Sequence, residues 1–136
     1  MTNLSQRSIT YIDLVLKGKW YDLIESGEKT AEYRKATEFW LKRIHGGDPI
    51  DLLSALTVEL AACVSDMVAG NRRAAKPICF DLKHHYVRFR RGYGKDAPTM
   101  MFYIGTTGYV CVPPAEVQAE VGSDPVIKLE LLQRVF

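Results

Sequence analysis

The chain has few cysteines, no long uninterrupted apolar run and almost no net charge. Its three cysteines, Cys63, Cys79 and Cys111, are far apart, so neither a disulfide framework nor a zinc site is predicted and buried, reduced thiols are expected. Residues 50–70, the most apolar stretch, carry three acids and do not reach the roughly 20 clean apolar residues that span a bilayer. The polar residues 1–8 lack the apolar segment of a secretory signal. We therefore expect a cytoplasmic protein with no membrane partner.

The composition is that of an ordinary globular protein. Apolar residues make up 47% of the 136 residues, which suits one domain with a sizeable core. The formal net charge of +2 is too small by itself to indicate a nucleic-acid partner. We expect a single domain over residues 1–136, and the distribution of charge matters more than its total.

Short segments with a regular spacing of apolar residues are separated by Gly, Pro and Asp along the chain. Helical spacing predicts short helices, and β-branched or aromatic runs predict strands. The expected fold is α+β, a small mixed β-barrel of about six strands flanked by helices. Short helices are expected at residues 19–26, 38–44 and 115–121, and strands at residues 8–16, 29–35, 77–82, 86–91, 99–105, 109–112 and 126–136.

The strongest helix prediction covers residues 48–70. Asp48 suits the N-cap and Pro49 the first helical position. Leu53, Leu56 and Leu60 recur at helical spacing, which predicts one buried face. The same residues could instead form a groove-binding surface for a protein partner.

The most informative stretch is residues 27–34, where a helix-ending glycine leads into a strand that bears Lys29, Glu32 and Arg34. A lysine beside apolar surface or another cation can act as a general base, and a neighbouring carboxylate can orient it. An arginine fork binds phosphate or carboxylate. The alternative is a solvent-exposed strand face with ordinary ion pairs. Lys29 and Glu32 lie on opposite faces of an ideal strand, so a bulge or a rotated turn is required for them to meet.

This stretch resembles the opening motif of ASCH domains, G-x-K-x-x-E-x-R, with Gly27, Lys29, Glu32 and Arg34 at the four fixed positions. Residues 87–93, Val-Arg-Phe-Arg-Arg-Gly-Tyr, are similar to the central strand of that family. ASCH domains resemble PUA domains, which are small β-barrels associated with RNA. The resemblance therefore implies an ASCH-like, PUA-like domain in which residues 48–70 form an inserted helix.

The activity that the resemblance implies is directed at RNA, a nucleotide or a nucleoside. Some ASCH-like proteins are similar to ribonucleases or to amidohydrolases of acetylated cytidine, and the motif lysine is the proposed base in the latter. That role falls on Lys29, with Glu32 as its partner or as a second acid-base group. The amidohydrolase branch is expected to have a hydroxyl residue at the position of Glu32, and Glu116 and Glu120 are candidates for its downstream glutamate by elimination alone. A hydrolase and a binding protein without turnover are therefore both open.

Basic and aromatic residues alternate between positions 83 and 95. Cations that meet phosphates and rings that stack on bases are typical of single-stranded RNA recognition. The alternative is an edge strand protected by charge, with Phe89 in the core. Arg34, Arg43 and Arg91 are expected to hold phosphates, and Trp40 or Tyr93 to stack on a base. The expected ligand-binding set is Arg34, Trp40, Arg43, Arg88, Arg90, Arg91 and Tyr93.

No metal or cofactor is expected. His84 and His85 would point in opposite directions on a strand, and no carboxylate or cysteine stands at ligand spacing from them. Helical aromatics such as Phe39 and Trp40 are assigned to the core rather than to a stacking platform. The competing functional hypothesis is a non-catalytic interaction module in which residues 48–70 bind a protein partner.

Overall fold

The computed structural model describes residues 10–45 and 49–136 and has a mixed α+β fold. The chain divides into two compact units, the first drawn from residues 1–30, 84–106 and 131–136 and the second from residues 31–83 and 107–130. Each unit contains one four-stranded sheet. Across the described residues, no strand pairing joins these sheets, so the expected α+β class is confirmed whereas the expected closed barrel is not formed.

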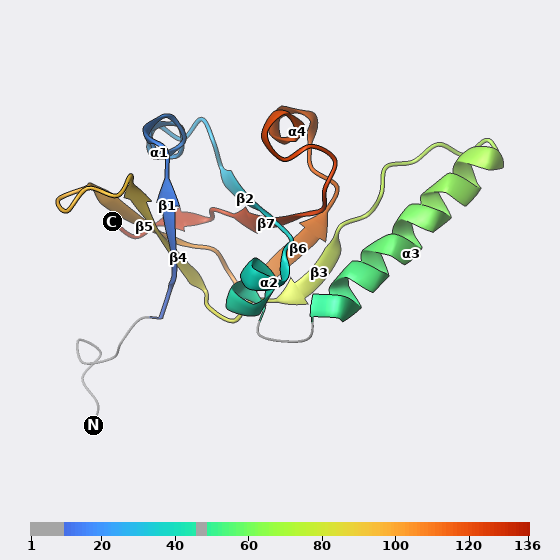
Figure 1. Ribbon diagram of the computed structural model, residues 1–136, viewed down its shortest axis with the longest axis horizontal. Helices are drawn as coiled ribbons and strands as arrows, with labels where there is room; N and C mark the ends of the chain where they lie inside the picture. The colour runs from blue at the N-terminus through green and yellow to red at the C-terminus, as the bar shows by residue number, and fades with distance from the viewer. Residues whose placement is uncertain (1–9, 46–48) are drawn as a thin grey trace, which may run out of the picture. The chain divides into compact units, whose positions relative to one another are not determined.

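The sheet of the first unit combines parallel and antiparallel pairing (Figure 1). Strand β1 (Ile12–Leu16) runs parallel to β4 (Tyr86–Arg91), which pairs antiparallel with β5 (Thr99–Tyr103). The short β8 (Gln133–Arg134) adds to β5, and helix α1 (Gly18–Glu25) follows β1. The buried core of this unit includes Ile12, Leu14, Leu16, Tyr21, Ile24, Val87, Phe89, Met100, Phe102 and Ile104.

The sheet of the second unit is antiparallel throughout, in the order β2-β7-β6-β3. Its strands are β2 (Ala31–Lys35), β7 (Val126–Glu130), β6 (Thr107–Cys111) and β3 (Ile78–Asp81). The single strand expected at residues 126–136 is therefore wrong, because β7 and β8 belong to different sheets. Two residues separate them, which is enough for the chain to change sheets.

Three helices accompany the second sheet: α2 (Glu38–Ile44), α3 (Pro49–Val68) and α4 (Ala115–Val121). The expected bounds of α2 and α4 are confirmed, and α3 confirms the helix expected over residues 48–70. Thr37 caps α2 by accepting a hydrogen bond from the Trp40 amide at 3.4 Å. The cap expected at Asp48 lies outside the described residues.

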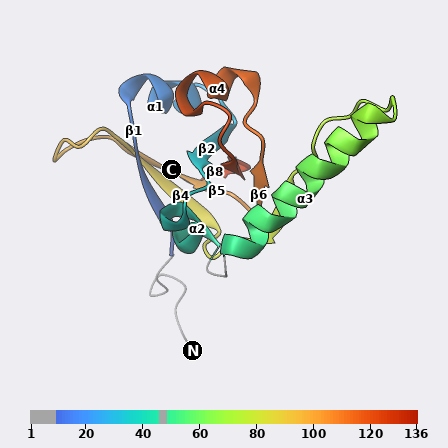
Figure 2. The same cartoon turned by 45° about the vertical axis from the view of Figure 1, so that its right-hand side comes forward.

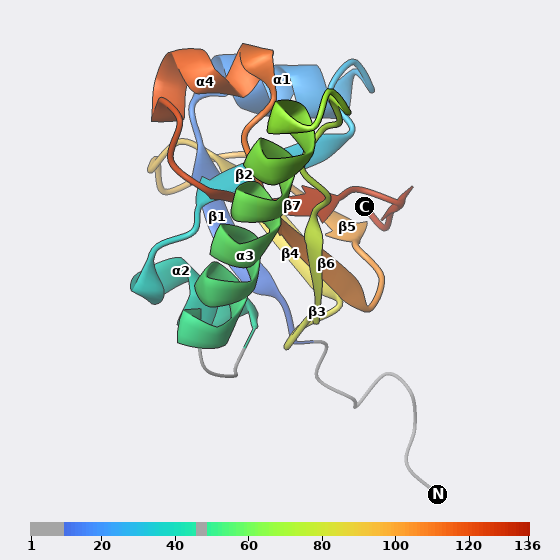
Figure 3. The ribbon, with the colours of Figure 1, turned by 90° about the vertical axis from the view of Figure 1, so that its right-hand side faces the viewer.

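Helix α3 packs on β3 and β6 through its first half only. Leu52 and Leu56 are buried, whereas Leu60 is 38% exposed. The expected buried face of Leu53, Leu56 and Leu60 is therefore wrong at Leu60, because the helix continues past the sheet that covers its start (Figures 1 and 3).

Two glycines show where local conformation was and was not predictable. Gly27 has φ +84° directly after the C-cap of α1, as a helix-ending glycine should. Gly108 lies in β6, where a Cβ atom would stand 2.6 Å from Phe80 Cζ and 2.8 Å from Leu82 Cδ2. This glycine thus allows β6 to pack closely against Phe80 and Leu82.

The three cysteines are free, and Cys79 is exposed while Cys63 and Cys111 are half-buried. The expectation of buried thiols is therefore wrong for Cys79, which points outward from β3, an edge strand. In the described part of the chain, no helix is long and apolar enough to cross a membrane.

Candidate nucleic-acid interface

The charged residues of the stretch 27–34 fall in both units, with Lys29 in the first and Glu32 and Arg34 in the second. Lys29 occupies the turn after α1, where its amide donates to the Leu23 carbonyl at 3.0 Å. Its Nζ lies 5.0 Å from the ring centroid of Trp20, and Lys19 Nζ lies 4.5 Å from the same ring. One indole therefore carries two ammonium groups by cation–π contact. Lys29 is half-buried, and its ammonium group shares the Trp20 ring with that of Lys19.

Glu32 is the charged residue at the core of the second unit. It is 3% exposed, and its carboxylate accepts hydrogen bonds from the Tyr33 amide at 3.0 Å and from Arg34 Nη2 at 3.4 Å. A buried carboxylate requires such partners to offset the cost of leaving water. The alternative of a solvent-exposed strand face is therefore wrong for Glu32, which instead holds the guanidinium of Arg34 in a fixed place.

Helix α2 places two aromatic rings beside arginine side chains. The Arg34 guanidinium lies 5.1 Å from the ring of Trp40, and the Arg43 guanidinium lies 4.2 Å from the ring of Phe39. The two rings meet edge to face at 5.0 Å. Together these contacts join two cations and two aromatic rings in one continuous group. We call this group the α2 cluster, and it consists of Arg34, Phe39, Trp40 and Arg43.

Phe39 is the member of the α2 cluster that sequence reasoning missed. It is 55% exposed, so its assignment to the core is wrong. A detectable pattern was present, because Phe39 and Arg43 stand four residues apart, the spacing that puts two side chains on one helical face. An exposed ring beside an exposed guanidinium can stack on a base while the cation meets a phosphate.

The basic strand of the first unit has a different chemical environment. Arg88 makes a two-bond pair with Asp13 at 3.1 and 3.0 Å, and Arg91 makes one with Asp22 at 3.0 and 3.1 Å. The hydrogen bonds from Arg91 lower the pKa of the Asp22 carboxyl. The hydrogen bonds to Asp13 and Asp22 raise the pKa values of Arg88 and Arg91. Two of the expected phosphate-binding residues are thus already paired with carboxylates.

Arg90 and Tyr93 complete the predicted set. No carboxylate of the described residues pairs with Arg90. Tyr93 is 90% exposed and lies between β4 and β5. The hairpin loop that joins these two strands is the gold loop at the left of Figure 2. These two side chains offer a cation and a ring to solvent, although no described contact joins them into a group like the α2 cluster.

The candidate downstream glutamates, Glu116 and Glu120, are both exposed on α4. Glu116 lies near enough to Tyr33 for its charge to raise the pKa of that phenol, after the larger effects of burial and Cys111. Within residues 10–45 and 49–136, no cluster of three or more His, Cys, Asp or Glu residues is placed to hold a metal ion. Comparison with protein-family models, with curated proteins and with solved structures finds no match for the chain.

Proposed function

We propose that the chain is an ASCH-like protein of the PUA-like class that binds single-stranded RNA or a nucleotide through the α2 cluster. The observation that supports the proposal is the pair of cation–ring contacts, Arg34 on Trp40 and Arg43 on Phe39. Bases and phosphates recur together in both ligands, and this cluster offers a ring and a cation side by side. Stacking on one aromatic side chain contributes about 1–3 kcal/mol per base.

Each residue of the cluster has a distinct part in this proposal. Phe39 stacks on a base with its exposed face, and Arg43 pairs with the adjoining phosphate. Arg34 is held from one side by Glu32 and from the other by Trp40, which fixes its fork for a second phosphate. The ordering cost of Arg34 is therefore low when the ligand binds.

Binding is tested with fluorescence anisotropy on a labelled single-stranded RNA of about ten nucleotides, with a mononucleotide as competitor, over a range of salt concentrations. Arg43→Ala should weaken RNA binding about tenfold and reduce the salt slope by about 0.7, the value of one phosphate contact on a single strand. Lys42→Ala is the matched control, because Lys42 is the adjacent cation but pairs with Glu38 at 2.8 Å. Equal losses in both variants, or no binding of either ligand at low salt, would contradict the proposal.

Turnover is a further part of the proposal, with Lys29 as the general base, whereas Glu32 holds Arg34 of the α2 cluster. Mass spectrometry of the RNA and of acetylated cytidine after incubation tests it. A product that wild type forms and Lys29→Ala does not would identify a hydrolase. Binding without product would identify a reader of RNA or nucleotides and remove the catalytic role of Lys29.

A further inference from the structure

Helix α3 carries a row of uncharged side chains that is exposed to solvent from Thr57 onward. Leu60, Val64 and Met67 are 38%, 57% and 52% exposed, Thr57 is exposed and Leu53 is half-buried. Successive members of the row are separated by four, three, four and three residues, the spacing that places side chains on one seam of a paired helix. We call this row, which consists of Leu53, Thr57, Leu60, Val64 and Met67, the α3 stripe.

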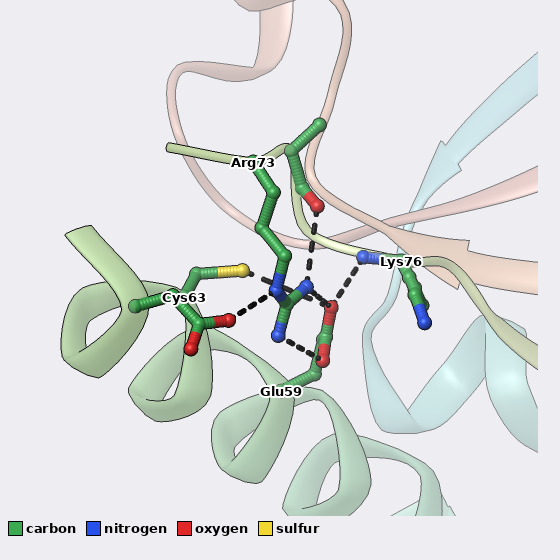
Figure 4. A network of polar contacts seen from close by, with 6 residues as sticks. Glu59, Cys63, Arg73 and Lys76 are labelled. Atoms are coloured by element: carbon green, nitrogen blue, oxygen red, sulfur yellow. Dashed lines mark hydrogen bonds and ion pairs between the residues drawn. The ribbon is translucent and has the colours of Figure 1, made fainter. Parts of the chain in front are cut away.

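The face of α3 that adjoins the α3 stripe is already occupied. Leu52 and Leu56 are buried where α3 packs on β3 and β6. Farther along, Arg73 donates to Glu59 and to Asp66, each at 2.6 Å, and the Lys76 amide donates to Glu59 (Figure 4). Residues 71–77 are thereby fixed along the helix. The α3 stripe is not part of these contacts, so it is available to a partner.

The chemistry of the α3 stripe matches a copy of itself. None of its five members is charged, and the acids of the helix, Asp51, Glu59 and Asp66, lie on other faces at helical spacing. Thr57 donates its hydroxyl to the Leu53 carbonyl at 3.0 Å, which leaves its methyl group for apolar contact. A second copy therefore brings no like charge and no unsatisfied hydroxyl to the contact.

We infer that two copies of the chain associate through an antiparallel pairing of α3 along the α3 stripe. When the two 20-residue helices overlap fully, Leu53 stands opposite Val64 of the second copy and Thr57 stands opposite Leu60 of the second copy. The same two pairs recur on the other side of the two-fold axis. Such a contact is isologous, so it closes as a dimer. The protein partner hypothesised for residues 48–70 is thus a second copy of the chain.

Electrostatics favours the antiparallel direction. The last turn of α3 contains no basic residue of its own, and the Arg73 guanidinium that reaches it is paired with Asp66 and Glu59, so a further positive charge is favourable at the negative end of the dipole. Antiparallel pairing places the positive end of the second helix beside it. A helix of 20 residues is about 30 Å long, so the pair buries on the order of 1,000 Å², near the lower limit of specific interfaces. The dimer should accordingly dissociate on dilution.

Sedimentation velocity over a range of protein concentrations tests the inference. Wild type should shift from a monomer of 15.4 kDa toward twice that mass as concentration rises. Val64→Glu should remain monomeric, whereas Val58→Glu, the same change on an exposed face of α3 outside the α3 stripe, should dimerise like wild type. Circular dichroism checks that the variants fold, and Met67→Lys replaces Val64→Glu if that variant does not. A wild type that stays monomeric at every concentration, or dimers that survive both stripe variants, would overturn the inference.

The direction of pairing is measured separately, by spin-label distances in a variant whose three native cysteines are replaced by serine. Labels are placed at Val58→Cys, near the middle of α3, and in a second sample at Val68→Cys, at its end. In each dimer the distance between the two equivalent labels is measured. Antiparallel pairing separates the two Val68 labels by about 28 Å along the helix axis, whereas the two Val58 labels lie almost level. Equal distances at both positions would indicate a parallel pair and contradict the proposed geometry.

Discussion

Arginines of the two units differ in how carboxylates hold them. In the first unit, Arg88 and Arg91 each make two hydrogen bonds to an aspartate, and Arg88 also lies 4.7 Å from the ring of Tyr11. In the second unit, Arg34 makes a hydrogen bond of 3.4 Å to Glu32 and lies on Trp40, whereas Arg43 lies on Phe39. Strand β4 is therefore the more neutralised of the two sets of cations. Under the proposed function, where the cations lie matters more for binding than how many there are.

The difference has a structural cause. Parallel pairing of β1 with β4 sets Asp13 beside Arg88 in register, and α1 places Asp22 within reach of Arg91. Both pairs are partly exposed to solvent, so each contributes little to stability. A phosphate that binds through the same N–H groups must nevertheless displace the carboxylate.

Replacement of Trp40 should have the largest effect on binding. Trp40→Ala removes the ring under Arg34 and the edge contact to Phe39, so RNA affinity should fall roughly 10- to 100-fold, as for loss of a stacking platform. Trp40→Phe keeps an aromatic ring and should retain most of the affinity. Anisotropy titration measures both, with circular dichroism as the check on folding. Arg88→Ala should change affinity less than about twofold by the same measure, and equal losses in Trp40→Ala and Arg88→Ala would refute the comparison.

Removal of the paired aspartates should release the arginines of the first unit. In the variant that combines Asp13→Asn with Asp22→Asn, Arg88 and Arg91 lose their charged partners, so RNA affinity at low salt should rise about three- to fivefold. The salt slope should steepen by about 0.7 for each phosphate gained. Asp51→Asn together with Asp124→Asn makes the same change in net charge away from β4 and is the control. Equal gains in both double variants would mean that net charge, rather than the pairing, limits binding.

The sequence predicted local structure better than it predicted neighbours. The bounds of α2, the helix-ending role of Gly27 and the buried Phe89 follow from short-range rules of capping, backbone freedom and alternation. Contacts between distant segments do not follow from such rules. No local pattern indicates that Asp13 lies beside Arg88, or that the strands form two sheets rather than one barrel.

The candidate residues were singled out by a local pattern, but their surroundings were not predicted. Lys29, Glu32 and Arg34 were found because four motif positions lie within eight residues. The burial of Glu32 and the exposure of Phe39 were not predicted, because each depends on what packs against β2 and α2. Propensity and periodicity describe one segment at a time, whereas burial is a property of the assembled unit.

The second unit also contains an arginine that is held by carboxylates. Arg73 donates hydrogen bonds to both Glu59 and Asp66. Its hydrogen bonds, with that of the Lys76 amide, lower the pKa of Glu59 from 4.5 to about 2. The folded state therefore binds this proton less readily than the unfolded state, and the stabilisation is complete above about pH 4.5 and lost as the pH falls toward about 2. Amide hydrogen exchange at Lys76, corrected for intrinsic rates, should show protection that declines through this window. Glu59→Gln should remove the pH dependence, and constant protection in wild type would count against the pairing.

The smallest expected effect is that of Gly18→Ala, which perturbs one arginine pair without changing any charge. A Cβ atom at position 18 would lie 2.7 Å from Arg91 Nη2, so the guanidinium must shift and its two bonds to Asp22 should weaken. Alanine also favours the helix by up to about 1 kcal/mol over glycine, and an exposed pair such as Arg91 with Asp22 contributes little to stability. The midpoint of thermal unfolding should consequently move by only a few degrees, while the Asp22 pKa, followed by NMR, should rise toward its ordinary value. An unchanged Asp22 pKa would mean that Arg91 adopts another rotamer and keeps its hydrogen bonds to Asp22. The pair would then not depend on the space that Gly18 leaves for the guanidinium.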